Sequence, residues 1–93
     1  MFTGVSRGKI KPGAREELAA LCTKLAKQAL PGVHLWMNFV TDDEELIVIA
    51  VFPTAAEREA TAPENARRWA SAAHLIEGPP IFTNAEMTQH VRP

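Results

Sequence analysis

The sequence lacks several features that mark large functional classes. Cys22 is its only cysteine, which excludes an intramolecular disulfide and a metal site built from several thiolates. Ten basic and eleven acidic residues give a formal net charge of -1, and no long run of either sign is present to follow a phosphate backbone. We therefore expect no nucleic-acid partner, and a single cysteine fits the reducing cytoplasm.

Longer functional motifs are missing as well. Residues 1–12 hold three basic side chains but no continuous apolar block, so we expect neither a targeting segment nor a membrane partner. No Gly-rich phosphate loop, nucleophile elbow or histidine–carboxylate metal spacing is present. One cysteine and three scattered histidines provide no evident metal site, and we expect neither a metal nor a cofactor.

What the chain does have is enough apolar sequence for one small core. It contains 93 residues, of which 46% are hydrophobic and 23% charged, a balance typical of folded rather than disordered chains. This length is too short for two ordinary domains. We expect a single domain over residues 1–93.

The first half of the chain predicts a strand, a helix and a hairpin. Residues 2–10 alternate and end at Lys11-Pro12-Gly13, and residues 14–30 repeat apolar side chains at three- and four-residue intervals: Leu18, Leu21, Cys22, Leu25 and Ala29. Pro31-Gly32 stops this helix. Residues 33–40 alternate again, and an acidic turn over 41–45 leads to the apolar run 46–52. We expect this run to be a central strand that is buried on both faces.

The second half predicts two helical pieces and a last strand. Thr54 can cap a short helix over 55–62, which Pro63 interrupts, and a second piece follows over 64–76. Gly78-Pro79-Pro80 then breaks the chain before a strand marked on one face by Ile81, Ala85, Met87 and Val91.

The predicted order is therefore β, α, β, β, α, β. This is the α+β, ferredoxin-like split-βαβ arrangement, with an antiparallel sheet and two helices on one of its faces. The other face would expose apolar residues from three strands, more than a soluble monomer usually shows. We expect a homodimer in which two sheets pair into a dimeric α/β barrel.

Three segments carry a resemblance to a known family. They are the Lys11-Pro12-Gly13 turn before an amphipathic helix, Pro31-Gly32-Val33 opening the second strand, and the third-strand run that ends in a short helix. On these segments the chain resembles the antibiotic biosynthesis monooxygenases. The resemblance implies a dimeric α/β barrel, a small-molecule substrate, and oxygenation without a cofactor of a polycyclic phenol or quinol that itself reduces dioxygen once deprotonated.

Two departures from that family limit what the resemblance implies. Family members often carry a His-x-x-Ser-Pro-His-Phe-like stretch, and the best match, residues 59–65, keeps Pro63 but reads Glu59 and Glu64 at the histidine positions. The haem-degrading branch uses an Asn on the first strand with a Trp and a His. Residues 1–12 contain no Asn, and Trp69 and His74 would lie about 140° apart around a helix. We therefore do not expect haem degradation.

Six residues are the candidate site. Trp36, Asn38 and Trp69 would contact an aromatic substrate between the sheet and the second helical region; core packing is the alternative for both tryptophans. His34 lies on the same predicted strand face as Asn38 and would contact a substrate hydroxyl; satisfied polar groups at the dimer interface are the alternative. Arg7 would stabilise a phenolate or form a surface ion pair, and His74 would act as a base or lie on a solvated helix face.

The sequence is compatible with two functions. The leading hypothesis is a cofactor-independent monooxygenase that acts on an aromatic or quinol-like small molecule. The alternative is a non-catalytic dimeric barrel that binds a small molecule or serves in a stress response, which the two glutamates at the histidine positions favour.

Overall fold

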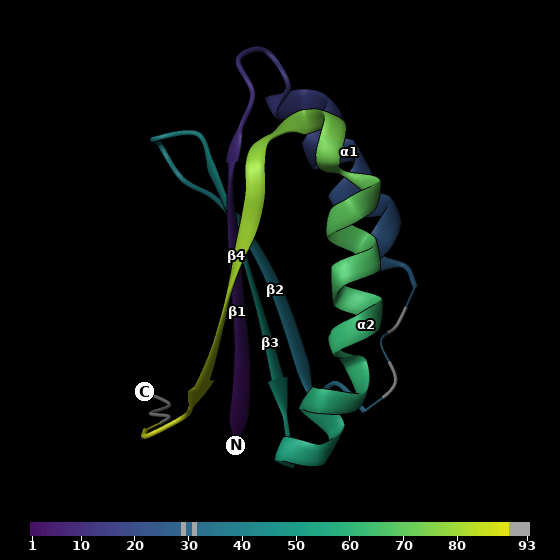
Figure 1. Ribbon diagram of the computed structural model, residues 1–93, viewed down its shortest axis with the longest axis vertical. Helices are drawn as coiled ribbons and strands as arrows, with labels where there is room; N and C mark the ends of the chain where they lie inside the picture. Colours follow the sequence, from purple (N-terminus) through teal and green to yellow (C-terminus); the bar gives the residue numbers. More distant parts are fainter. Residues whose placement is uncertain (29, 31, 90–93) are drawn as a thin grey trace.

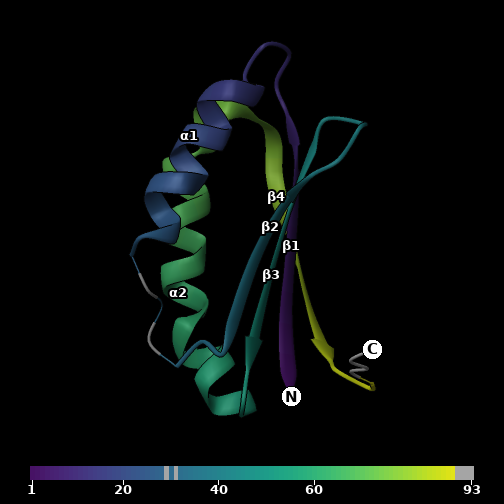
Figure 2. The same cartoon turned by 180° about the vertical axis from the view of Figure 1, so that it is seen from behind.

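A computed structural model describes residues 1–28, 30 and 32–89 and has the predicted element order (Figure 1). Strands β1 (Phe2–Ile10), β2 (Leu35–Val40), β3 (Glu45–Phe52) and β4 (Ile76–Glu86) form one antiparallel sheet in the order β2-β3-β1-β4. Helices α1 (Arg15–Ala26) and α2 (Ala55–Ser71) cover one face of it, and a 3-10 turn, η1 (Ala73–Leu75), leads into β4 (Figures 1 and 2). This is the α+β, ferredoxin-like fold that the sequence predicts.

Strand β1 follows its predicted bounds and supplies small residues to the helix-covered face of the sheet. Gly4, Ser6 and Gly8 lie opposite Ala50, Val48 and Leu46 of β3, and alternation places their odd-numbered neighbours on the other face. These small residues leave room above the middle of the sheet. Both the core and the cavities described below occupy that room.

The core lies between the sheet and the two helices at the end of the molecule where β1 ends and α1 begins. It is built from buried side chains of β1, α1, β3, α2, η1 and β4: Ile10, Leu18, Leu46, Val48, Trp69, Ala72, Leu75 and Ile76. Ala29, predicted on the apolar stripe of the first helix, and Val91, predicted on the last strand, lie outside the described residues, as does Pro31.

Helix α2 corrects the predicted break at Pro63. The structure has one continuous helix from Ala55 to Ser71, with Pro63 inside it and Thr54 as the N-cap, whose side chain accepts a hydrogen bond from the Glu57 amide. Proline removes one intrahelical hydrogen bond. Pro63 lies on the exposed side of the helix, while Thr61, Arg68 and Trp69 bury the opposite side on both flanks of it. This packing outweighs the lost bond.

Strand β4 corrects a second break. The strand begins at Ile76, which was predicted to be helical, and continues through Gly78-Pro79-Pro80 to Glu86. Arg7 pairs with Ile81 and Lys9 with Glu77, so residues 78–80 form a bulge opposite Gly8. The two prolines are tolerated because β4 is an edge strand, and Gly78 adopts a φ of 72° at the bulge.

The sheet face opposite the helices is apolar, as predicted, and no described element covers it (Figures 1 and 2). Leu35 and Phe39 of β2 and Ile81 of β4 are between 45% and 61% exposed there. Ile47 and Ile49 of β3 are partly exposed, so the prediction of a strand buried on both faces is wrong for a single chain. In the part of the chain that the structure describes, no helix is long and apolar enough to cross a membrane.

Candidate functional site

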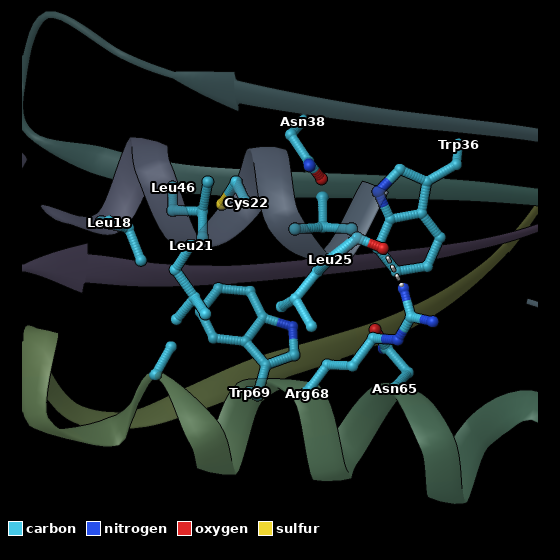
Figure 3. Close-up of a pocket in the computed structure, with 12 residues that line it drawn as sticks. Leu18, Leu21, Cys22, Leu25, Trp36, Asn38, Leu46, Asn65, Arg68 and Trp69 are labelled. Atoms are coloured by element: carbon cyan, nitrogen blue, oxygen red, sulfur yellow. Dashed lines mark hydrogen bonds between the residues drawn. The ribbon is translucent and has the colours of Figure 1, made fainter. Parts of the chain in front are cut away.

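The structure brings Trp36, Asn38 and Trp69 together around a small cavity (Figure 3). Trp36 and Asn38 project from β2, Trp69 projects from α2, and leucines of α1 close the third side. The cavity has a volume of about 30 Å³, room for a water molecule but not for an aromatic ring. Substrate contact by these three residues therefore stays a prediction, and in this geometry the two tryptophans pack as core.

Trp69 is held in one orientation by two residues of β1. Its indole Nε1 donates a hydrogen bond of 2.8 Å to Ser6 Oγ, and both residues are buried. Gly8 lies directly under the indole ring, because a Cβ there would lie 2.8 Å from Trp69 Cζ3. The indole also meets Phe82 of β4 edge to face, with ring centroids 6.5 Å apart. Trp69 thus belongs to the core and also contacts β4.

Arg68 ties the two helices together beside the small cavity. Its guanidinium donates to the carbonyl oxygen of Leu25 at 3.2 Å, near the end of α1 (Figure 3), and to that of Gln28 at 2.6 Å. It also donates to Glu64 and lies 5.3 Å from the Trp36 ring centroid. Arg68 is only 6% exposed, so these contacts fix the spacing between α1 and α2.

The two glutamates at the family's histidine positions are placed differently. Glu59 is exposed, whereas Glu64 pairs with Arg67 and Arg68. The side-chain hydrogen bond from Arg67, with that from Arg68, holds the pKa of Glu64 below its usual value. Glu64 is therefore ionised at neutral pH and has no proton to donate.

The remaining sequence-predicted residues lie away from the interior. Arg7 is on the exposed face of the sheet and forms a 2.9 Å ion pair with Glu45. His34 is exposed and precedes β2, and its backbone amide donates to the Val51 carbonyl. His74 is exposed in η1, with Nε2 3.8 Å from a Glu17 carboxylate oxygen. The structure does not bring these three residues together, and their catalytic roles stay predictions.

A larger cavity lies between the sheet, α2 and β4. Its volume is about 310 Å³. It is lined by residues of β1, β3, α2 and β4 and by Leu30 of the segment before β2: Gly4, Val5, Ser6, Leu30, Val48, Ala50, Phe52, Arg58, Thr61, Ala62, Asn65, Ala66, Phe82, Thr83 and Asn84. An apolar cavity with a few converging polar groups is the usual form of a small-molecule site.

The polar side chains of this cavity differ in which of their hydrogen-bonding groups are already paired within the protein. Thr61 Oγ1 already donates to carbonyls of its own helix, those of Glu57 and Arg58. Ser6 accepts from Trp69, and no hydrogen bond from its hydroxyl proton is found within the described residues. The half-buried Asn65 side chain has no hydrogen bond there either. Ser6 and Asn65 are thus free to bind a ligand oxygen.

Sequence reasoning missed this cavity because it divided α2 at Pro63. In a continuous helix Arg58, Thr61, Ala62, Asn65 and Trp69 recur at three- and four-residue intervals and form one stripe. A predicted helix that continued through Pro63 would have placed these residues on one side of it. The contribution of Ser6 and Phe82 depends on how β1 and β4 pair, which no local pattern contains.

The described residues contain no group of three or more His, Cys, Asp or Glu side chains close enough to hold a metal ion. The expectation of a protein without metal or cofactor stays a prediction. Cys22 is half-buried, and burial raises the pKa of its thiol, which is therefore protonated at neutral pH and a poor metal ligand.

Comparisons with known proteins extend the description of the fold. No protein-family model matches the sequence, and a search of curated proteins finds no match. Among solved structures, a protein of unknown function from Nitrosomonas europaea is 24% identical, with a TM-score of 0.83 over 99% of this chain and 93% of that one. A structure named antibiotic biosynthesis monooxygenase is 17% identical, with a TM-score of 0.75 over 96% of this chain and all of that one.

A third structure of this kind contains a ligand. It is a monooxygenase from the gene ActVA-Orf6 of Streptomyces coelicolor in complex with nanaomycin D, 17% identical, with a TM-score of 0.75 over 99% of this chain and 91% of that one. At these identities the likeness concerns the fold. The chain therefore has the fold of the antibiotic biosynthesis monooxygenases, as its sequence resemblance predicts.

Proposed function

We propose that this protein is a cofactor-independent monooxygenase that binds a flat aromatic or quinol-like molecule in the larger cavity. The observation that carries the proposal is the cavity of about 310 Å³ between the sheet and α2, with an aromatic wall and uncommitted polar groups. The solved monooxygenase of the same fold in complex with nanaomycin D supports it. Substrate and reaction are our proposal.

The cavity provides what oxygenation without a cofactor requires. Triplet dioxygen reacts slowly with closed-shell organic molecules, so the site must favour an electron-rich substrate anion and keep it from bulk water. Phe82 offers a ring on which a flat substrate can stack, while Ser6 and Asn65 offer donors to its oxygen. Anthrone illustrates the balance: with one dioxygen it gives the quinone and one water.

A non-catalytic binding protein is the second candidate function. None of the described residues that line the larger cavity is a His, Asp, Glu, Lys, Cys or Tyr, so this part of the wall supplies no general base. Catalysis would then depend on substrates that ionise readily in water. A protein that only binds its ligand needs no such base.

The functional unit that we propose is a homodimer in the cytoplasm. The apolar sheet face supports the dimer, because its partly exposed side chains would be buried between two copies. In such a barrel the two cavities would lie on opposite outer sides of the paired sheets. The cytoplasmic location rests on the single cysteine of the sequence.

Oxygen consumption tests the catalytic proposal. Purified protein without added cofactor is mixed with hydroquinones and anthrones in an oxygen electrode, and the parent is compared with Asn65→Ala and Phe82→Ala. Loss of one contact to a charged substrate oxygen slows turnover by about ten- to a hundredfold. Uptake that stays at background for every substrate would favour the binding function.

A second set of variants decides between the two candidate sites. Arg7→Ala, His34→Ala and His74→Ala alter the residues that the sequence singled out, and Trp69→Ala removes the indole that contacts the cavity residues Ser6 and Phe82. If the cavity is the site, the first three variants match the parent and Trp69→Ala is slow. Slow turnover in the first three, with Asn65→Ala unchanged, would place the chemistry elsewhere.

A further inference from the structure

Among the described residues that line the larger cavity, Arg58 is the one with a charged side chain. Every other arginine of the described chain has a carboxylate partner: Arg7 pairs with Glu45, Arg15 with Glu44, and Arg67 and Arg68 with Glu64. No ion pair of Arg58 is found among the described residues. A half-buried cation without a counter-charge is unfavourable in a protein, and a ligand can supply that charge.

The contacts of Arg58 fix its guanidinium but leave donors unused. Nη1 donates a 3.0 Å hydrogen bond to the Ala85 carbonyl of β4, and the guanidinium carbon lies 5.6 Å from the centroid of the Phe2 ring. Nε is buried and has no hydrogen-bond partner, and Nη2 has none within the described residues. Because Nε has no exposed surface, Nη2 is the donor that remains for an oxygen of a bound carboxylate.

We propose that Arg58 binds a carboxylate carried by the aromatic ligand of this cavity. A carboxylate is ionised at neutral pH, whereas a phenol with a pKa of about 10 is almost wholly protonated there and brings no counter-charge. The ligand's ring then lies toward Phe82 and Asn65, and its acid group lies toward the start of α2. This inference rests on the proposed function, since it names the substrate class of the same cavity.

A matched pair of probes tests the charge preference. Naphthalene-2-carboxylate and naphthalene-2-carboxamide have nearly the same shape and differ in charge, and their binding is measured by calorimetry at pH 7. The parent protein should bind the carboxylate about ten- to a hundredfold more tightly than the amide, the effect of one charge-assisted contact. Equal affinities would overturn the inference.

Variants then assign the preference to Arg58. Arg58→Met should lower the affinity for the carboxylate far more than the affinity for the amide, so that the preference disappears, and Arg58→Lys should keep part of it. Arg67→Gln is the matched control, since it removes a charge from the exposed side of the same helix and should leave the preference intact. A carboxylate preference that survives in Arg58→Met would overturn the assignment, and a merely structural role for Arg58 predicts that both affinities fall together.

The remaining outcomes separate this inference from the proposed function. If the parent binds neither naphthalene, the cavity does not take aromatic ligands and the proposed function fails. If it binds both equally but binds 2-naphthol more tightly as the pH rises toward 10, the favoured anion is a phenolate. The cavity then keeps its proposed function and the carboxylate inference fails.

Discussion

Gly8 shows how one backbone position controls the interior of this protein. A Cβ at this position would lie 2.8 Å from Trp69 Cζ3 and 2.9 Å from Ile76 Cγ2, both atoms of tightly packed side chains. Trp69 in turn is hydrogen-bonded to Ser6, which lines the larger cavity. The absence of a side chain at Gly8 therefore helps to set the position of a residue that holds one of the polar groups of our proposed site.

Gly8→Ala is expected to destabilise the fold. Overpacking a filled interior costs about 1–3 kcal/mol, so the midpoint of urea denaturation should fall with little change in slope. Gly4→Ala is the matched control, because it lies on the same strand face and a Cβ there meets nothing within 4 Å. Equal effects of the two substitutions would mean that contact with Trp69 is not what requires glycine.

The Ser6–Trp69 hydrogen bond gives a second prediction at this scale. Ser6→Ala leaves the buried indole N–H without an acceptor, which costs about 1–3 kcal/mol of unfolding free energy. Trp69→Phe removes the donor as well, so the double variant should be more stable than the sum of the two single changes predicts. Additive changes in a urea-denaturation cycle would contradict a coupled pair.

The contacts of individual side chains were the hardest feature to predict from the sequence. Alternation placed Trp36 and Asn38 on one face of the second strand, and in the structure both lie on the helix-covered face, near Trp69. It could not show that leucines of α1 fill the space between them, because that depends on the distance between helix and sheet. Arg7 was assigned either an ion pair or a catalytic role, and its pairing with Glu45 of another strand was open until the register was known.

At the scale of elements, the regular parts were predictable and the interrupted ones were not. The bounds of β1, the hairpin of β2 and β3, and the capping of α2 by Thr54 follow from local pattern and turn chemistry. Pro63 and Gly78-Pro79-Pro80 predicted breaks, and both elements continue through them. Burial of the opposite helix side and the edge position of β4 decide these cases, and both are properties of the assembled fold.

Pro63→Ala is expected to stabilise the protein. The substitution restores the intrahelical bond to the Glu59 carbonyl at an exposed position, and a proline in a helix interior is about 3 kcal/mol less favourable than alanine. We expect a gain of about 1–3 kcal/mol, because the helix already accommodates the ring. Thermal and urea denaturation measure it.

Pro53→Ala provides the contrast, since Pro53 lies before the N-cap, outside the helix. There the loss of proline mainly increases the freedom of the unfolded chain, and stability should fall by about 0.4–1 kcal/mol. A loss of stability in Pro63→Ala as well would show that packing of α2 on the sheet requires the shape that proline gives the helix.

At the scale of the whole molecule, the order of elements was sufficient to predict the split-βαβ topology and its one-sided helix layer. The apolar character of the uncovered face was visible in the strand sequences. What covers that face was not, because an exposed apolar sheet is compatible with any complementary surface. The homodimer therefore remains a prediction at this scale, and it decides whether the proposed barrel exists.

We expect the purified protein to have twice the 10.2 kDa mass of one chain in light scattering at micromolar concentration. Each large apolar side chain that becomes fully buried contributes about 1.5–3 kcal/mol, and Leu35, Phe39 and Ile81 are all available on the open face.

Ile49→Lys tests this pairing, because it places a charge in the middle of the open face, where pairing would leave it buried without a partner. Its mass should fall to that of a monomer while its circular dichroism stays that of a folded protein. Ala20→Lys, on the exposed side of α1, should remain a dimer. A parent protein that has the mass of one chain and melts cooperatively would show that the apolar face is stable in water, and the dimeric barrel would have to be abandoned.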